Sequence, residues 1–420
     1  MSRMNEIYGA FSVDRPIFKS ESTLVFDSIS IESHSRDLSR SDDHEFQVQE
    51  NIRSLFGKTG RRLSQIGGHP DFTHLETTGS QEKGYVVSLF VDIKGSTKLG
   101  LVYSPEQVFW IKNQIIKCAM ETILAFDGHV HRIMGDAVLA FFRGNQTTPR
   151  DSAINAINCG TYLVEFMRSV VSPKMKEFGV QDDVGIRVGV DYGPHEKVIW
   201  GMYGYAGLSE VTATSYHVDV AAKLQQRASN NRVMIGQELA ELLDLHEDII
   251  ECKITAGDED KYVKPNYTDI SGKPKNYRQF VIKHNSYFEM LPKPEDTALP
   301  ISITSIEING QEEAELFKCA RCAGRQIHIK FSASFSIPGW NHSEIKVRFR
   351  VENHGKQAAT ATDYANHSTE VKATRNENGR YSASNIEPTA YVGLHYMFVS
   401  VIDADGKVIH KEQKFPVYIG

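Results

Sequence analysis

Hydrophobic and polar positions change their pattern along this chain, and each change marks a different kind of structure. Residues 1 to about 45 are rich in Ser, Asp, Glu and Arg and keep no sustained period, which predicts a mobile N-terminal arm. Residues 46 to 80 place apolar side chains at helical spacing, interrupted at "GKTG", so we expect a helical lead-in that could serve as a dimer or regulatory element.

Residues 81 to 288 alternate strand-like and helix-like patterns. The strand Val86 to Val91 is followed by a helix over "SPEQVFWIKNQIIKCAMETILAFDG" and the hairpin "HVHRIMGDAVLAFF". A helix from Asp151 to about Met167 comes next. It precedes the strand "VGIRVGVDYGP", a Gly/Tyr-rich loop, the helix "HVDVAAKLQQRA" and the strand "RVMIG". This β-α-β-β-α-β order predicts an α+β domain of the ferredoxin-like type.

The last part of the chain has a third pattern. Three prolines in "LPKPEDTALP" discourage helix and central strand, so residues 289 to 300 are predicted to be a linker. Apolar and charged residues alternate in "EIKVRFRVENHG", as in an antiparallel strand with one buried face, and "HYMFVSVIDADGKVIHKEQKF" predicts a hairpin around Asp405 and Gly406. Residues 301 to 420 are therefore expected to form a small all-β, immunoglobulin-like sandwich.

Composition narrows the class of protein. The 420 residues carry a net charge of -6, which argues against a general nucleic-acid-binding surface. The first residues lack the apolar core of a secretory signal and no later run is long enough to span a bilayer, so we expect a cytoplasmic protein without a membrane anchor. The 5 cysteines include one close pair, "CARC", which is half a zinc site at most, and ordinary reduced thiols are the simpler interpretation.

Two carboxylates are the main candidates for chemistry. Asp92 ends the apolar strand, and Asp136 lies in the turn of the following hairpin. Each alone is also typical of an ordinary strand end or turn. In a ferredoxin-like sheet, however, these two strands are neighbours, and adjacent anions repel unless a divalent cation lies between them. With the carbonyl of Ile93 they would suit two Mg²⁺ or Mn²⁺ ions, an arrangement that serves in-line displacement at phosphorus.

The turn after Asp92 suggests the other half of a nucleotide site. Gly95, Ser96 and Thr97 supply a flexible turn and a helix N-cap, where free backbone N–H groups can hold phosphate oxygens. Lys273, in the loop "SGKPKNYRQF", is a further candidate triphosphate contact, together with its neighbour Lys275. Loop lysines are common without such a role.

Four ordered motifs carry a family resemblance: "FVDIKGST", "HRIMGDAVLAFF", "GIRVGVDYGP" and "HVDVAAKLQQRAS". In this order they resemble the catalytic domain of class III nucleotidyl cyclases, the adenylate and guanylate cyclase family, over about residues 85 to 284. The resemblance implies a homodimer whose sites lie at the interface. One chain would supply the metal aspartates, matching Asp92 and Asp136, and the other the residues that read the base and stabilise the transition state.

Several positions depart from the purine-cyclase pattern. The purine-reading lysine of the family corresponds to Arg132 here, and the second base-reading position to Thr212. The ribose-orienting asparagine corresponds to Asp219 and the transition-state arginine to Lys223. Lys223 keeps the positive charge without the bidentate geometry of Arg. Asp219, Lys223 and Arg227 share one helix face by their spacing, which is also typical of a solvated row of ion pairs.

Altered base-reading positions suggest an altered base. The bacterial antiphage cyclases called Pycsar, which make cyclic UMP or cyclic CMP, resemble this chain in the "DIKGST" turn, in Tyr85 ahead of the metal strand, and in a β-rich C-terminal sensor domain of some members. Tyr85 could contact a pyrimidine, and Phe90 is kept as a second candidate. An aromatic residue in a strand is more often part of the core.

The resemblance therefore implies a pyrimidine nucleotide cyclase that converts UTP or CTP to the 3′,5′-cyclic nucleotide and pyrophosphate. UTP is slightly favoured. The product would be a second messenger for a separate effector protein in antiphage defence, and the C-terminal domain would sense infection or position the dimer. Two alternatives stay open: an adenylate cyclase in which Arg132 and Thr212 read adenine, and a non-catalytic cyclase-like dimer that acts as a binding module.

Overall fold

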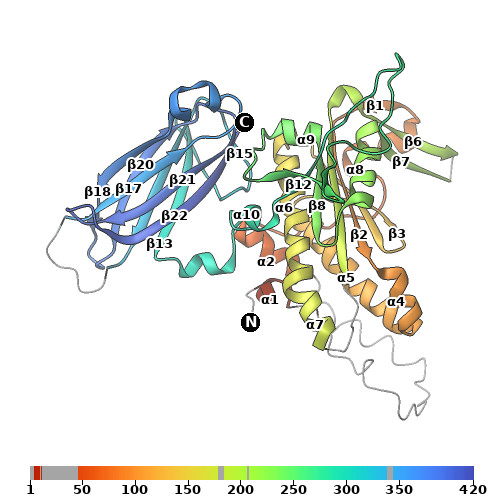
Figure 1. Ribbon diagram of the computed structural model, residues 1–420, viewed down its shortest axis with the longest axis horizontal. Helices are drawn as coiled ribbons and strands as arrows, with labels where there is room; N and C mark the ends of the chain where they lie inside the picture. Colours follow the sequence, from red (N-terminus) through yellow and green to blue (C-terminus); the bar gives the residue numbers. More distant parts are fainter. Residues whose placement is uncertain (1–3, 10, 12–45, 178–183, 206–207, 338–343) are drawn as a thin grey trace, which may run out of the picture.

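The computed structural model describes residues 4–9, 11, 46–177, 184–205, 208–337 and 344–420. A mixed α/β part built around a seven-stranded sheet lies beside an all-β part of two five-stranded sheets, which is blue in Figure 1. Within these ranges, the helices are all too short or too polar to cross a membrane.

The seven-stranded sheet contains the predicted metal strand in its interior. Its order is β3-β4-β2-β5-β8-β12-β9, and only β5 and β8 pair in parallel. The strands are β2 Val86–Lys94, β3 His129–Met134, β4 Ala137–Phe142, β5 Gly185–Gly193, β8 Arg232–Gly236, β9 Ile250–Cys252 and β12 Gln279–Ile282. With α5 and α6 between them, the first four strands follow the order β-α-β-β-α-β. This topology confirms the predicted ferredoxin-like domain.

Helices cover both faces of this sheet. α5 (Pro105–Ala125) and α6 (Pro149–Phe166) bury the apolar side chains that β2 directs to one face. α8 (Tyr216–Arg227) packs against β2 and β5 on the other face. The run of β2 from Val86 to Val91, apolar apart from the buried Ser88, follows from this double cover, because a strand buried on both faces has no solvated side.

The start of α5 agrees with the predicted helix boundary. The Ser104 hydroxyl accepts a hydrogen bond from the Gln107 amide at 3.4 Å, and the Gln107 side chain accepts one from the Ser104 amide at 3.0 Å. Pro105 occupies the first turn, where its missing N–H leaves no acceptor unsatisfied.

The predicted Gly/Tyr-rich loop is instead a projecting hairpin. β6 (Ile199–Tyr205) and β7 (Leu208–Thr214) pair antiparallel, and β1 (Gln81–Lys83) completes a small sheet at the far edge of the molecule (Figure 1). Trp200 anchors its base, stacked on Phe72 with ring centroids 4.3 Å apart. Glycines and polar residues interrupt the alternation of apolar and polar positions in β6 and β7, so the sequence did not predict these strands.

The mixed part contains further short elements. The α-helices are α3 Leu75–Thr78, α4 Ser96–Val102, α7 Ser172–Glu177, α9 Gln237–Leu242 and α10 His284–Phe288. The remaining strands are β10 Ile254–Thr255 and β11 Asp258–Glu259, and single helical turns of other types are Pro70–Phe72, Met167–Val171 and His195–Lys197.

The N-terminal region differs from the expected mobile arm at its first residues. α1 (Met4–Ile7) and the neighbouring Tyr8 and Phe11 are buried in the main core, where the Tyr8 and Phe166 rings lie 4.4 Å apart. Residues 12–45 of the predicted arm lie outside the described residues. In the lead-in, α2 (Gln47–Leu55) ends before "GKTG" and no helix resumes directly after it.

Residues 301 to 420 form the predicted β-sandwich. One sheet has the order β14-β13-β16-β20-β19 and the other β15-β22-β21-β17-β18, and aromatic and aliphatic side chains from both fill the space between them. The strands are β13 Ile301–Asn309, β14 Glu312–Glu315, β15 Cys322–Ala323, β16 His328–Phe335, β17 Lys346–Glu352, β18 His367–Lys372, β19 Thr374–Arg375, β20 Tyr381–Pro388, β21 Gly393–Ile402 and β22 Val408–Ile419. Short 3-10 turns are Pro294–Ala298, Ala358–Thr360 and Thr362–Ala365.

The sandwich packs directly on α6 and is not held by the linker alone. The Asn158 amide nitrogen donates to the Cys319 carbonyl at 2.8 Å, and its oxygen accepts from the Tyr287 hydroxyl at 2.8 Å. The Tyr418 hydroxyl donates to that of Tyr287 at 3.1 Å, so both domains share one buried polar group. Asp151 accepts from the amide of Cys322, and all 5 cysteines are free thiols.

Candidate functional site

The structure brings Asp92 and Asp136 to the same end of the central sheet. Asp92 lies near the end of β2, where its register partner on β4 is Ala137. Asp136 immediately precedes Ala137, in a tight turn whose Gly135 has a φ of 66°. A glycine adopts this left-handed backbone conformation at little energetic cost. The tight turn at Gly135 places Asp136 just after the end of β3. The predicted pairing of the two acids therefore has a local structural basis.

The Asp92 carboxylate is held by two neighbouring side chains. Arg187, its register partner on β5, donates through Nε to Oδ2 at 3.1 Å and also through Nη2. Gln225, from α8, donates its amide to the same oxygen at 3.0 Å. Among the residues that the structure describes, no donor reaches Oδ1, so the second oxygen of Asp92 is available for another ligand.

Asp136 has an unsatisfied oxygen. Its Oδ2 is buried and has no hydrogen-bond partner within the described ranges. A buried carboxylate oxygen without a partner is costly, and such groups in proteins commonly face an ion. Together with the open oxygen of Asp92, this arrangement fits the divalent cation that the family implies. Ile93, the third predicted ligand, follows Asp92 with its side chain buried, and only its carbonyl could contribute.

The predicted phosphate turn directly follows this carboxylate. Gly95 has a φ of 83° and caps α4, whose first residues are Ser96 and Thr97. The Gly95 carbonyl accepts the amides of Lys98 and Leu99. The first N–H groups of a helix have no acceptor inside it, so the amides of Ser96 and Thr97 are suited to phosphate oxygens.

Tyr85 lies at the opposite end of β2 from Asp92. Its hydroxyl donates to the Thr147 carbonyl at 2.6 Å and lies 3.1 Å from the Ser152 hydroxyl, at the start of α6. Phe90 lies two residues before Asp92 on the same face and packs beside the cluster that contains Trp200. In this chain Tyr85 holds a loop in place, and Phe90 is the aromatic residue nearer the acids in sequence.

The two candidate base-reading residues, Arg132 and Thr212, lie on strands of two neighbouring sheets, and Arg132 already has an acidic partner. Arg132 on β3 makes an ion pair with Glu210 on β7, and its Nε donates to Glu210 at 3.3 Å. Thr212 lies two residues further along β7, on the same face of the strand as Glu210. His131 Nε2 is also 3.2 Å from Glu210. The Arg132 guanidinium is therefore already paired with an acid, and Thr212 lies on the strand that supplies this acid.

The helix candidates line a cavity of about 560 Å³ on the outer side of α8. Asp219 and Lys223 lie on its wall with Lys275 and Tyr267, and Lys223 Nζ lies 5.3 Å from the centre of the Tyr267 ring. Arg227, the third member of the predicted face, instead pairs with Asp260. Arg227 thus has a structural partner of its own and does not neutralise Asp219.

The loop lysines separate into two environments. Lys275 lines the cavity beside Lys223, with Nζ 5.8 Å from the centre of the Tyr216 ring. Lys273 is exposed in a tight turn, where its amide donates to the Asp269 carboxylate at 3.0 Å. Lys275 is therefore the better placed of the two for contact with a ligand of this cavity.

A buried polar group fixes the first turn of α8. Asp191 on β5 is fully buried, and its carboxylate accepts from the Tyr277 hydroxyl at 2.8 Å and lies 3.2 Å from His217 Nδ1. Burial raises the pKa of Asp191. Because His217 lies in α8 only two residues before Asp219, this group positions the helix that carries the candidate cations.

Sequence reasoning missed four residues of this region: Arg187, Gln225, Glu210 and Asp191. Arg187 and Asp191 are charged residues inside the apolar strand "GIRVGVDYG", and that interruption was a usable signal. Gln225 and Glu210 gave no such signal, because their importance arises from contacts with distant segments.

Two family models match the chain. The adenylate and guanylate cyclase catalytic domain matches residues 78–283, and the adenylyl/guanylyl and SMODS C-terminal sensor domain matches residues 276–420.

The chain is 42% identical over 387 residues to a cytidylate cyclase from Escherichia coli, which covers 89% of this chain and 83% of the relative. A cytidylate cyclase from Staphylococcus aureus is 35% identical over 380 residues, covering 86% of this chain and 85% of the relative. A solved structure, the adenylyl cyclase CyaB from P. aeruginosa, aligns with 48% of this chain and 95% of its own, at 19% identity and a TM-score of 0.39.

Proposed function

We propose that this protein cyclises a pyrimidine nucleoside triphosphate and prefers CTP to UTP. The chain belongs to the class III nucleotidyl cyclase family and is a nucleotidyl cyclase. The product is the 3′,5′-cyclic nucleotide, and pyrophosphate leaves. The pairing of Asp92 with Asp136 at one end of the sheet carries the chemistry of this proposal. The names of the similar cytidylate cyclases support the choice of base, and their likeness extends over both domains.

The residues have distinct roles in the proposed reaction. Asp92 and Asp136, with the carbonyl of Ile93, would hold two Mg²⁺ or Mn²⁺ ions, which as Lewis acids lower the pKa of the ribose 3′-hydroxyl and offset phosphate charge. The 3′-oxygen attacks the α-phosphorus, its proton is lost to water, and the bond to the β-phosphate oxygen breaks. The amides of Gly95, Ser96 and Thr97 would hold the departing phosphates. Of the two loop lysines, Lys275 on the cavity wall would be the further contact in place of the exposed Lys273.

Lys223 would stabilise the charge that develops at the α-phosphate, but it cannot act on the Asp92 of its own chain. Gln225 faces Asp92, and Lys223 lies two residues earlier on α8, about 200° around the helix. The two side chains of one helix thus point to different sides. A homodimer in which each site combines Asp92 of one chain with Asp219 and Lys223 of the other resolves this geometry.

A shared site also accounts for the predicted base contacts. Tyr85, immediately before β2, lies seven residues before Asp92, roughly 23 Å along the chain, which is too far for both to contact one nucleotide. We therefore assign the base contact to Phe90, Arg132 and Thr212 of the second chain, because Phe90 and Arg132 share one row of the sheet through Leu139. Tyr85, five residues before Phe90 and bonded to the Thr147 carbonyl, would not reach the same base. Exposed apolar side chains on the β6–β7 hairpin, Tyr205 and Leu208, are consistent with such a partner surface.

The two-domain organisation supports a regulated enzyme. A C-terminal domain of the sensor family packs on α6, the helix whose start contacts Tyr85. We propose that this domain controls cyclase activity during phage infection and that a separate effector protein reads the cyclic nucleotide. Expression of the wild type, but not of Asp92→Ala, should protect bacteria against phage. Equal protection by both would contradict this role.

The substrate proposal is tested by incubating the purified protein with each of the four nucleoside triphosphates and Mn²⁺ or Mg²⁺. Cyclic CMP should dominate, and Asp92→Ala should give none. Dominant cyclic UMP would keep the reaction and change the base, whereas dominant cyclic AMP would contradict a pyrimidine cyclase. No turnover of any nucleotide would favour a non-catalytic binding module.

The shared site has a sharper test. Asp92→Ala should be inactive alone and Lys223→Ala should lose activity by about 10²–10³-fold, because each removes one half of both sites in its dimer. A mixture of the two variants, unfolded and refolded together or co-expressed, should recover activity, since a mixed dimer contains one site with both groups. Failure to recover activity, with mixed dimers demonstrated by differential tags, would contradict the two-chain site.

A further inference from the structure

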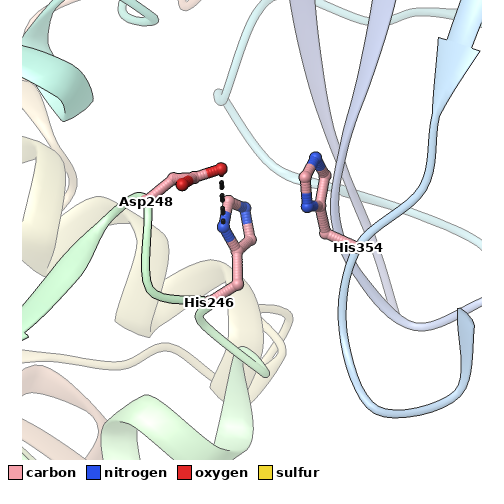
Figure 2. Close-up of side chains that lie close together, drawn as sticks. All are labelled: His246, Asp248 and His354. Carbon is pink, nitrogen blue, oxygen red and sulfur yellow. Dashed lines mark ion pairs between the residues drawn. The ribbon is translucent and has the colours of Figure 1, made fainter. Parts of the chain in front are cut away.

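Two histidines and an aspartate from different domains meet beside the domain interface. His246 and Asp248 lie between α9 and β9 of the catalytic domain, and His354 follows β17 of the sandwich (Figure 2). One ligand atom from each of the three side chains lies within 4.8 Å of the others. Figure 2 shows the two catalytic-domain side chains facing His354 across the interface.

The ring nitrogens at this place lack partners. His246 Nδ1 and His354 Nε2 are both buried, and neither has a hydrogen-bond partner in the described part of the chain. The Asp248 Oδ2 lies 3.6 Å from His246 Nδ1, and the Glu352 Oε2 lies 3.9 Å from His354 Nε2, both too far for a hydrogen bond. Two buried nitrogens and a carboxylate without internal hydrogen bonds are groups that a cation could satisfy together.

Neighbouring residues fix the ring of His246 and the backbone of His354. The Tyr396 hydroxyl from β21 lies 3.1 Å from His246 Nε2, which leaves Nδ1 as the nitrogen that faces Asp248. The backbone of His354 is fixed by its amide, which donates to His395 Nδ1 at 3.2 Å. Histidine ligands of metal ions are commonly oriented by a hydrogen bond to the other ring nitrogen, as Tyr396 supplies here.

We propose that His246, Asp248 and His354 form a transition-metal site, of the kind that binds Zn²⁺, which cross-links the catalytic domain to the sensor domain. Imidazole with one carboxylate is typical of Zn²⁺ and related ions, whereas Mg²⁺ and Mn²⁺ favour oxygen ligands. Burial lowers the pKa of His246 to about 4, so its ring is neutral near pH 7, the form that binds metal.

The site has an open side. A cavity of about 760 Å³ between the two domains includes Asp248 and Tyr396 in its wall, which gives an ion and a water ligand access from solvent. The His246 and His354 rings are stacked at present, with centroids 4.1 Å apart and an angle of 15° between planes. A metal lies in the plane of each ligating ring, so binding requires one ring to turn out of this stack. The metal-bound and metal-free forms therefore differ at the domain interface.

The stack offers a variant that separates metal binding from packing. His354→Phe keeps an aromatic ring against His246 but removes the nitrogens. The full-length protein is stripped with a chelator, equilibrated with Zn²⁺ and dialysed, and the retained zinc is measured. Wild type should retain one equivalent more than His354→Phe, and Asp248→Asn should bind it at least about tenfold more weakly. Zinc should raise the melting temperature of wild type and not of His354→Phe.

The control is His328→Phe, an exposed histidine on β16 that should retain zinc like wild type. Zinc bound at the aspartates of the cyclase site should be equal in wild type and in the three variants, so it does not affect the difference in retained zinc between them. Co²⁺ provides a spectroscopic check, since histidine ligation gives visible absorption bands that His354→Phe should lack. Equal zinc retention and equal melting shifts in wild type and His354→Phe would overturn the proposal, whatever the cyclase activity.

Discussion

Arg187 donates from two of its guanidinium nitrogens to a single oxygen of Asp92, its register partner on the neighbouring strand. The side chains are partly buried, 29% exposed for Arg187 and 16% for Asp92, so the pair is partly shielded from solvent. The Arg187 guanidinium offsets the negative charge of Asp92 at the end of the sheet where Asp136 adds a second acid. Sheet register, and not sequence proximity, thus brings positive charge to the candidate metal site.

Arg187→Gln should lower the free energy of unfolding by about 1–3 kcal/mol, because it removes a charged donor from a mostly buried carboxylate. Urea unfolding monitored by circular dichroism measures the change. Arg232→Gln is a matched control: Arg232 lies opposite Arg187 on β8, is exposed, and within the described ranges its side chain bonds only to the carbonyl of the adjacent Asn231. Its effect should stay within about 0.5 kcal/mol. Equal losses in both variants would contradict a specific role of the Arg187 pair.

Asp136→Asn should separate activity from stability. The variant keeps the size of the side chain but removes a metal-binding carboxylate, so product formation should fall by at least about a hundredfold. The free energy of unfolding should stay the same or rise, because the wild type buries an oxygen without a partner. Cyclase assays and urea unfolding of the same preparation measure both. A variant that loses stability but keeps activity would indicate that Asp136 is an ordinary turn residue.

His69 should make the protein sensitive to mild acid. Burial lowers its pKa to about 3, and its Nδ1 accepts a hydrogen bond from the Asp71 amide at 3.2 Å, so the folded protein holds the ring neutral. The unfolded chain gains a proton near pH 6.5 and the folded chain does not. Stability is therefore full above that pH and is lost as the pH falls, by about 1.5 kcal/mol between pH 6.5 and 5.

His69→Asn is the variant that tests this effect. Asn can still accept the Asp71 amide at this cap position but does not titrate. The variant should therefore lose about 1.5 kcal/mol less stability than wild type between pH 6.5 and 5. Unfolding free energies measured across this interval provide the comparison. Parallel pH profiles for the two proteins would show that His69 does not contribute.

The features that sequence predicted are those encoded by short segments. The apolar run of β2, the start of α5 at Pro105, and the turn at Gly135 each depend on neighbouring residues, and each lies where it was expected. The proximity of Asp92 and Asp136 followed from the β-α-β-β order, since the topology makes β2 and β4 neighbours.

The features that sequence missed depend on contacts between distant segments. Tyr8 and Phe11 pack on Phe166, and the sequence around them does not predict this contact. Glu210 binds Arg132 from a hairpin that was read as a loop, because glycines at 201 and 204 weaken its alternation. Propensity alone does not identify a strand whose pairing is stabilised by tertiary contacts.

Lys223 and Lys275 line the same cavity, which allows a comparison between two cations of one site. If Lys223 stabilises the transition state, Lys223→Ala should lower kcat by about 10²–10³-fold with little change in KM. Lys223→Arg should retain most of the activity, because it keeps the charge and adds donors. Lys275→Ala should raise KM and leave kcat within about tenfold, since a ground-state contact contributes to binding. Steady-state kinetics of the three variants with the preferred nucleotide measures these effects. Equal losses of kcat in the two alanine variants would mean that the cavity binds phosphate through its general positive charge and that Lys223 has no specific role in the transition state.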